Sequence, residues 1–288
     1  MYKLIAIDLD GTLLNSYGEI SEENRKAIKY AIDKNIEVVL ASGRDTDTMK
    51  KMSLDLGIRS FLVTGNGASI YNIKKQENIY ESFLEQKKAL KIIDICKNNS
   101  IFFNVYTDKG IITENINYNV KVFNSENNAK PIEKQTNIEV VENLYEYVKD
   151  NKLNILKIII CDESKVIFNR IIEKISKINR VDILEVEHMS KKNIRDGTNN
   201  INVEYFYTEI SNKGTNKWEA LKYLANYLNI LEEEIMCIGD NENDRRMIEN
   251  AGLGVSMKNS ALASKNIGTY ITEDNDSNGV ALAIHKFL

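Results

Sequence analysis

Residues 4–12 read LIAIDLDGT, and this stretch decides the predicted fold. The four apolar residues 4–7 are typical of a short strand that is buried on both faces, as in a parallel sheet. In open α/β sheets ligands bind beyond the carboxyl ends of the strands, so Asp8 and Asp10 are expected at a binding edge. The alternative is an ordinary turn at the strand end, because Asp and Gly are common turn formers.

The two aspartates are expected to act together. In an extended segment the side chains of Asp8 and Asp10 point the same way, because side chains alternate along a strand. Two carboxylates on one side repel each other unless a cation or a proton lies between them. The spacing therefore favours a site that binds a cation or holds a proton.

Helices and strands are predicted to alternate after this first strand. Ser21 is a suitable N-cap, with two glutamates behind it and apolar residues on one face of the helix that follows. Residues 36–40 are expected to form the second strand, residues 45–56 a second helix and residues 61–63 a third strand. This alternation predicts right-handed crossovers and a parallel sheet.

The same pattern returns near the C-terminus. Residues 215–229 carry apolar side chains on one helical face, and residues 235–238 form an apolar strand. A short helix over 243–250 and a strand over 254–257 complete the predicted elements there.

The middle of the chain has a different pattern. Between residues 84 and 212 the predicted strands are rich in aromatic and β-branched residues. The Asn-rich segments 124–128 and 198–202 are interpreted as surface loops. We therefore predict an α/β fold: a Rossmann-like parallel core of residues 1–83 and 213–288, with an inserted α+β domain over 84–212. The strands expected in the insertion are 101–106, 155–160, 181–186 and 203–210, and the helices are 86–98, 139–149 and 163–177.

A second acidic cluster follows the strand at 235–238. Residues 239–244 read GDNEND, with Asp240 at the strand end and Asp244 opening the next helix. Adjacent parallel strands would bring Asp8, Asp10, Asp240 and Asp244 together, and four carboxylates call for a divalent cation. Oxygen ligands in a partly hydrated octahedral site favour Mg²⁺. Taken alone, the segment could be a polar loop that caps a helix.

Two further groups suit a phosphate. Residues 41–44 read ASGR after the second strand, where the Ser42 hydroxyl and nearby backbone amides could hold a phosphate oxygen. The alternative is a generic strand-to-helix turn. Lys217 lies 23 residues before Asp240 at the start of a helix, and its candidacy depends on its partners, since most helical lysines are solvated charges.

The composition excludes several classes of protein. The 288 residues are 43% hydrophobic and 28% charged, with a net charge of −4, so neither a nucleic acid nor an anionic membrane is an expected partner. Three cysteines and two histidines argue against a disulfide framework and against multi-histidine catalysis. No apolar run spans a membrane and no secretion signal is recognised, so a cytoplasmic protein is expected.

Four segments of the chain, in their order, resemble the haloacid dehalogenase superfamily of phosphotransferases. They are the segments that contain Asp8 and Asp10, Ser42, Lys217 and Asp240. The insertion between Ser42 and Lys217, together with an Asn-Gly-Ala turn at 66–68, is similar to the Cof-like class IIB branch. Residues 239–247, GDNENDRRM, resemble that branch's Gly-Asp-x-x-Asn-Asp-x-x-Met signature. The resemblance covers essentially the whole chain.

The resemblance implies a role for each matching residue. Asp8 would be the nucleophile, Asp10 the general acid and then base, and Lys217 a catalytic group that also holds the phosphoryl group. Mg²⁺ would be bound by Asp8, the backbone carbonyl of Asp10 and Asp240, with Asp244 supporting the site. The phosphate contacts implied are Leu9, Ser42, Gly43, Lys217 and Asn243.

Two positions depart from the branch's pattern. Trp218 stands where glycine usually follows the lysine, and Asp45 stands where proline often follows Ser-Gly-Arg. Trp218 could crowd the mouth of the site or pack into the core, and we favour packing.

The implied function is a Mg²⁺-dependent phosphatase that hydrolyses small phosphate monoesters through an aspartyl phosphate on Asp8. Sugar phosphates or pyridoxal phosphate are the expected substrates, and the inserted domain is expected to close over them. Asp10 would need a raised pKa to hold a proton at neutral pH. A phosphomutase of the same capped design and a non-catalytic sugar-phosphate-binding protein are the alternatives, and the oligomeric state stays open.

Overall fold

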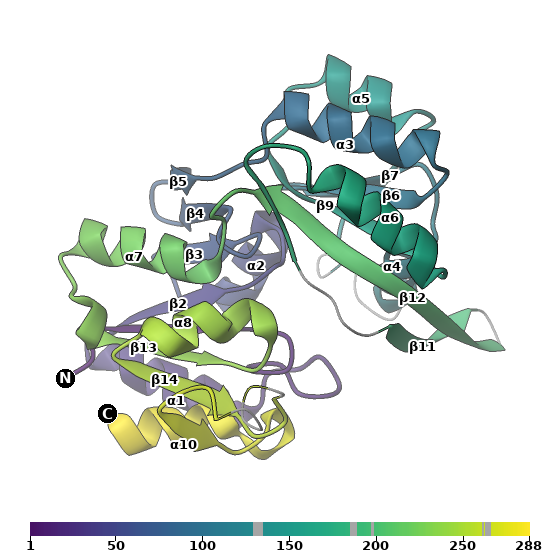
Figure 1. Ribbon diagram of the computed structural model, residues 1–288. Helices are drawn as coiled ribbons and strands as arrows, with labels where there is room; N and C mark the ends of the chain where they lie inside the picture. The colour runs from purple at the N-terminus through teal and green to yellow at the C-terminus, as the bar shows by residue number, and fades with distance from the viewer. Residues whose placement is uncertain (129–134, 185–188, 197–198, 261, 263–265) are drawn as a thin grey trace. The chain divides into compact units, whose positions relative to one another are not determined.

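The computed structural model describes residues 1–128, 135–184, 189–196, 199–260, 262 and 266–288 (Figure 1). The chain divides into two compact units. Residues 1–81 and 215–288 form the first, here called the core unit, and residues 82–214 form the second, the inserted unit. Within the described ranges, no helix combines the length and apolar character needed to span a bilayer.

A mostly parallel sheet organises the core unit. Strand β1 (Leu4–Ile7) lies between β2 (Glu37–Ala41) and β13 (Ile235–Gly239), and all three run parallel. The predicted parallel sheet is confirmed. A hairpin of two antiparallel strands, which the sequence pattern did not predict, extends one edge. The remaining strands are β3 (Phe61–Thr64), β4 (Ser69–Asn72), β5 (Glu77–Glu81), β14 (Leu253–Met257) and β15 (Tyr270–Thr272), and the sheet order is β15-β14-β13-β1-β2-β3-β4-β5.

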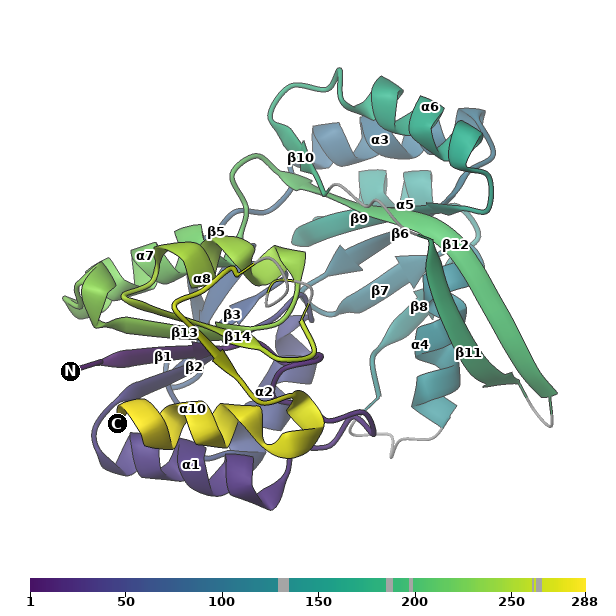
Figure 2. The same cartoon turned by 60° about the horizontal axis from the view of Figure 1, so that its bottom comes forward.

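Helices cover both faces of this sheet (Figures 1 and 2). Ile5 and Ile7 of β1 join an apolar cluster with α1 (Glu22–Asp33) and α10 (Gly279–Phe287). Leu4 and Ala6 join a second cluster on the opposite face. That cluster includes α7 (Lys217–Leu228) and α8 (Arg245–Asn250). Because successive side chains of a strand point to opposite faces, one apolar run supplies both clusters.

Side-chain caps fix where the first two helices of the core unit begin. Ser21 accepts the backbone N–H of Asn24, as the sequence predicts for the start of α1. Asp45 caps α2 (Thr46–Asp55): its Oδ1 accepts the backbone N–H of Thr48 at 2.9 Å, and its Oδ2 accepts the Thr48 hydroxyl at 2.7 Å. An N-cap aspartate thus begins α2 at the position where the family branch often has proline. Short 3₁₀ turns lie at Glu232–Glu234, Glu242–Asp244 and Asn275–Ser277.

The inserted unit has a sheet of its own, antiparallel except for its β7–β8 pair. Helices α3 (Gln86–Asn98), α5 (Leu144–Asp150) and α6 (Lys165–Ile175) pack their apolar side chains against it. The strand order is β10 (Val181–Ile183), β12 (Asn199–Asn212), β9 (Ile155–Asp162), β6 (Phe102–Thr107), β7 (Gly110–Thr113) and β8 (Ile138–Val140), with β11 (Ser190–Asp196) paired to β12.

Both Asn-rich segments interpreted as loops belong to regular elements wherever the structure describes them; residue 198 lies outside the described residues. Residues 124–128 end helix α4 (Tyr118–Asn128), where Asn127 exchanges hydrogen bonds with the backbone of Thr136. Residues 199–202 begin β12, and their backbone pairs with β11. The loop interpretation of these residues was wrong because pairing with the neighbouring strand β11, and side-chain hydrogen bonds between Asn127 and Thr136, outweigh the low propensity of asparagine.

Two predicted boundaries in the inserted unit also change. The helix expected over 139–149 begins only at Leu144, because residues 138–140 form β8, which pairs with β7. The strand expected over 181–186 ends at Ile183, and residues 185–186 lie outside the described residues.

Trp218 packs into the core unit. Its side chain is 4% exposed within the cluster that α7 forms against the sheet. The packing interpretation therefore holds, and Trp218 contributes apolar burial.

We expect Trp218→Ala to lower the free energy of unfolding by about 3–5 kcal/mol, because it leaves a large cavity in a packed core. Urea unfolding followed by circular dichroism measures the loss. Leu282→Ala is the control, since Leu282 is about half exposed and should cost less than about 1 kcal/mol. Equal losses in the two variants would contradict the packing role.

Candidate active site

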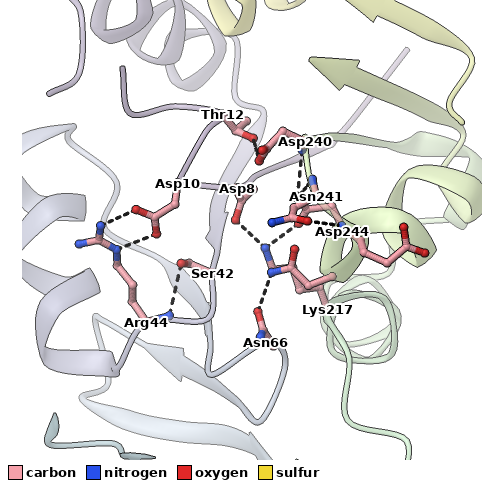
Figure 3. Close-up of polar contacts among 12 residues, drawn as sticks. Asp8, Asp10, Thr12, Ser42, Arg44, Asn66, Lys217, Asp240, Asn241 and Asp244 are labelled. Atoms are coloured by element: carbon pink, nitrogen blue, oxygen red, sulfur yellow. Dashed lines mark hydrogen bonds and ion pairs between the residues drawn. The ribbon is translucent and has the colours of Figure 1, made fainter. Parts of the chain in front are cut away.

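Polar side chains from five segments meet at the carboxyl end of the core sheet (Figure 3). The segments follow β1, β2, β3 and β13, and the fifth is the start of α7. Parallel strands place their carboxyl ends at one edge, so segments far apart in sequence converge there. All of these segments belong to the core unit.

Lys217 lies at the centre of this group. It is the first residue of α7, whose N-cap Asn216 accepts the backbone N–H of Glu219. The Lys217 side chain is fully buried, and its Nζ lies 2.6 Å from Oδ1 of Asp8 and 2.6 Å from Oδ1 of Asp244. Burial by itself would lower the pKa of Lys217, but Asp244 and Asp8 outweigh it and hold that pKa above its ordinary value.

Three carboxylates surround this lysine. Asp8, Asp240 and Asp244 each offer an oxygen, and these oxygens lie within 4.8 Å of one another. Burial, and then the charge of Asp244, raise the pKa of Asp8 well above its ordinary value. The same two causes raise the pKa of Asp240 to about 6. Three carboxylates face one ammonium group, so the ionised cluster carries excess negative charge, and this donor set fits a divalent cation.

The acidic residues differ in their partners. Oδ2 of Asp244 accepts the backbone N–H groups of Asp240 and Asn241 at 3.0 and 3.1 Å, while its Oδ1 contacts Lys217. Both oxygens of Asp244 are thus engaged within the protein. Asp240 accepts a hydrogen bond from the Thr12 hydroxyl at 3.0 Å, and the Ser260 hydroxyl donates to its backbone carbonyl.

Asp10 is not part of this cluster. Its side chain is 61% exposed and pairs with Arg44, with Nη2–Oδ1 and Nε–Oδ2 distances of 2.5 and 2.9 Å (Figure 3). The expected group of four carboxylates is therefore a group of three. The expectation assumed an extended segment, whereas β1 ends at Ile7 and the chain turns, with the N–H of Leu13 bonded to the carbonyl of Asp8.

The residues implied as phosphate contacts lie around the same edge. Ser42 is buried, and its Oγ accepts the backbone N–H of Arg44 at 3.3 Å. The Leu9 side chain is buried in the apolar core, so any phosphate contact would come from its backbone. Asn243 donates from Nδ2 to Oδ1 of Asn66 at 3.0 Å.

Sequence reasoning gave no role to Thr12, Arg44 or Asn66. Each lies in one of the sequence motifs, and that position was the signal that could have identified it. Thr12 lies close to Asp10, Arg44 lies close to Ser42, and Asn66 begins the Asn-Gly-Ala turn. Their partners lie 228, 34 and 177 residues away, and only the tertiary structure shows them.

The comparisons with known proteins agree with one another. The family model of haloacid dehalogenase-like hydrolases matches residues 5–284. A curated relative, the 5-amino-6-(5-phospho-D-ribitylamino)uracil phosphatase YcsE of Bacillus subtilis (strain 168), is 32% identical over 290 residues, which are 99% of this chain and 96% of the relative.

Solved structures share the fold. A haloacid dehalogenase-like hydrolase from Bacteroides thetaiotaomicron superposes with a TM-score of 0.81 at 27% identity, and 100% of each chain is covered. The haloacid dehalogenase subclass IIB sugar phosphatase BT4131 superposes with a TM-score of 0.76 at 19% identity, covering 99% of this chain and 98% of that one.

Lys217→Met should destabilise the protein by about 3–5 kcal/mol near neutral pH, because it leaves buried carboxylates without their counter-charge. The loss should shrink as the pH falls. The folded-state pKa of Asp8 is already raised, so its protonated form is compatible with burial, and stability is lost as the pH rises through that pKa. Urea unfolding in EDTA across a pH series measures the effect.

Lys222→Met on the same helix is the matched control. Lys222 pairs with Glu219 at 2.9 Å, but its side chain is one-third exposed, so removing it should cost no more than about 1 kcal/mol at any pH. A loss for Lys217→Met that does not vary with pH would contradict the charge argument.

Proposed function

Because the chain belongs to the haloacid dehalogenase-like hydrolase family and is a phosphoric monoester hydrolase, we propose that its substrates are small phosphate monoesters. In this proposal Mg²⁺ is the cofactor and Asp8 is the nucleophile. One observation carries the proposal. The buried Asp8 carboxylate is held at 2.6 Å by the Lys217 ammonium, beside two further carboxylates. That arrangement orients a nucleophile and supplies positive charge where a phosphate dianion has to approach.

In the first step an oxygen of Asp8 forms a bond to phosphorus, and the bond from phosphorus to the ester oxygen breaks. The product is an aspartyl phosphate, which splits one difficult step into two easier ones. Lys217 neutralises charge on the phosphoryl group and keeps Asp8 in position. Ser42, Asn243 and the backbone N–H groups near them are proposed to bind the phosphoryl oxygens.

Asp10 is proposed to move the protons. It donates a proton to the departing alkoxide and then removes one from the water that attacks phosphorus in the second step. That attack breaks the bond from phosphorus to the Asp8 oxygen, which releases inorganic phosphate and restores the Asp8 carboxylate. In the structure Asp10 pairs with Arg44. The role therefore requires Asp10 to exchange that contact for one with the leaving-group oxygen, which the arrival of an anionic phosphoryl group beside Arg44 favours.

Asp8 and Asp240 are proposed to hold the cation, with the backbone carbonyl of Asp10 as the ligand that the resemblance implies. Asp244 supports the site, because both of its oxygens already have protein partners. When bound, Mg²⁺ supplies Lewis-acid stabilisation of the charge on the phosphoryl group.

We propose that the inserted unit acts as the cap that the resemblance implies and sets the choice of leaving group. All the groups proposed to bind and attack the phosphoryl group belong to the core unit, which leaves selection of the leaving group to the other unit. Candidate substrates are sugar phosphates and the phosphoribitylamino-uracil named for the relative.

Stabilisation by Mg²⁺ should depend on pH. A carboxylate must lose its proton to bind a metal ion. Because the pKa of Asp240 is raised to about 6, the rise in Tm caused by a fixed Mg²⁺ concentration should be larger at about pH 7.5 than at about pH 5. Asp240→Asn should abolish the rise and Asp47→Asn, on the exposed face of α2, should preserve it. An equal rise at both pH values would argue against the Asp240 site.

Hydrolysis should require Asp8. With p-nitrophenyl phosphate and Mg²⁺, Asp8→Asn should lose more than about a thousandfold in kcat, as removal of a catalytic nucleophile does. EDTA should also stop turnover, and Asp47→Asn should leave it unchanged. Acid quenching of the wild type with ³²P-labelled substrate should leave label on the protein that hydroxylamine removes. Full activity in a folded Asp8→Asn protein would contradict the assignment of Asp8 as the nucleophile.

A further inference from the structure

The turn after β3 is bonded to the segment after β2. Asn66 has a left-handed backbone conformation, with φ +57°. Its N–H donates to the carbonyl of Ser42 at 2.9 Å, and the N–H of Gly65 donates to the carbonyl of Arg44 at 3.0 Å. This turn therefore fixes the backbone on both sides of Gly43, where a phosphate is proposed to bind.

The Asn66 side chain reaches a second segment. Its Oδ1 accepts a hydrogen bond from Nδ2 of Asn243 at 3.0 Å. At the other end of that carboxamide, Oδ1 of Asn243 is buried and has no hydrogen-bond partner among the described residues. The bond to Asn66 is thus the contact that orients the Asn243 carboxamide.

Two glycines show how closely the turn is packed. A Cβ on Gly43 would lie 3.0 Å from Oδ1 of Asn66, so a bare glycine backbone makes room for that carboxamide. A Cβ on Gly67, which has φ +93°, would lie 2.2 Å from the carbonyl oxygen of Asn216 and 3.0 Å from the backbone N of Lys217. The same turn therefore packs directly against the start of α7.

From these contacts we infer that Asn66 is a positioning residue for phosphoryl transfer. It acts through Asn243, whose carboxamide it aims at the phosphoryl group, and its turn holds the Ser42 segment and the start of α7 in register. The inference rests on the proposed phosphatase function, in which Asn243 contacts the phosphoryl group. Small misalignments of such groups cost rate, because their geometry has to match the transition state.

A double-mutant cycle tests this inference. Asn66→Gly removes the carboxamide and keeps a residue that adopts a positive φ without strain. Asn66→Gly and Asn243→Ala should each lower kcat/KM for p-nitrophenyl phosphate by about tenfold, the effect of losing one hydrogen bond. The double variant should be no more than about twofold below Asn243→Ala, because residues that act through one another are not additive.

Asn229→Gly is the matched control. Asn229 has φ +56° at the exposed C-cap of α7, so it tests the effect of an Asn-to-Gly change at positive φ away from the site. It should leave kcat/KM unchanged, because its side chain lies outside the site. Asn66→Asp keeps an acceptor for Asn243 and adds a negative charge, so it should retain more kcat than Asn66→Gly while its KM for the phosphate ester rises.

The outcomes separate the inference from the proposed function. Turnover by the wild type, with single losses that multiply in the double variant, would overturn the positioning role and leave the phosphatase standing. The positioning role is likewise overturned if Asn66→Gly leaves kcat/KM unchanged, as Asn229→Gly should, or if Asn66→Asp loses as much kcat as Asn66→Gly. A wild type that hydrolyses no phosphate ester would instead overturn the proposed function.

Discussion

The rest of the site depends on one buried ammonium group between two carboxylates. Lys217 is fully buried and contacts Asp8 and Asp244, which lie 209 and 27 residues away in the sequence. Burying a charge is costly unless it is paired and hydrogen-bonded. The pairing therefore ties the first strand, the helix after the insertion and the segment after β13 into a single arrangement.

The same interaction leaves the cluster short of positive charge. Asp244 engages its two oxygens with Lys217 and with two backbone N–H groups. Asp8 and Asp240 have raised pKa values, chiefly because they are buried and then because Asp244 is close. A site of this kind favours the arrival of a cation, and the fixed ammonium favours that of a phosphate. Both preferences are consistent with a phosphatase of this family.

Contacts from the surrounding loops fix the positions of the polar groups around that lysine. Thr12 and Ser260 hold the side chain and the backbone carbonyl of Asp240. Asn66 connects the segments after β2 and β13. Arg44 holds Asp10 away from the buried carboxylates. The acidic residues thus divide into a buried group that organises charge and an exposed Asp10, which is proposed to transfer protons.

The amino-acid sequence alone was enough to predict the central parallel strands of the core sheet and the approximate place of the site. An apolar run of four residues followed by acids, repeated at β13, carried that prediction, because parallel strands bring their carboxyl ends to one edge. The same rule predicted that four carboxylates would meet, and all but Asp10 do. The start of α1 was also predictable, since a Ser cap acts within a few residues of itself.

Other features depend on contacts that form only in the folded chain. The direction of the Asp10 side chain depends on Arg44 and on a turn that ends the strand at Ile7. The described residues of the Asn-rich segments 124–128 and 198–202 lie in a helix and in a strand, and the residue composition predicted neither. Local pattern reports which backbone conformation a residue favours, whereas side-chain orientation and the pairing of polar segments depend on contacts between residues that only folding brings together.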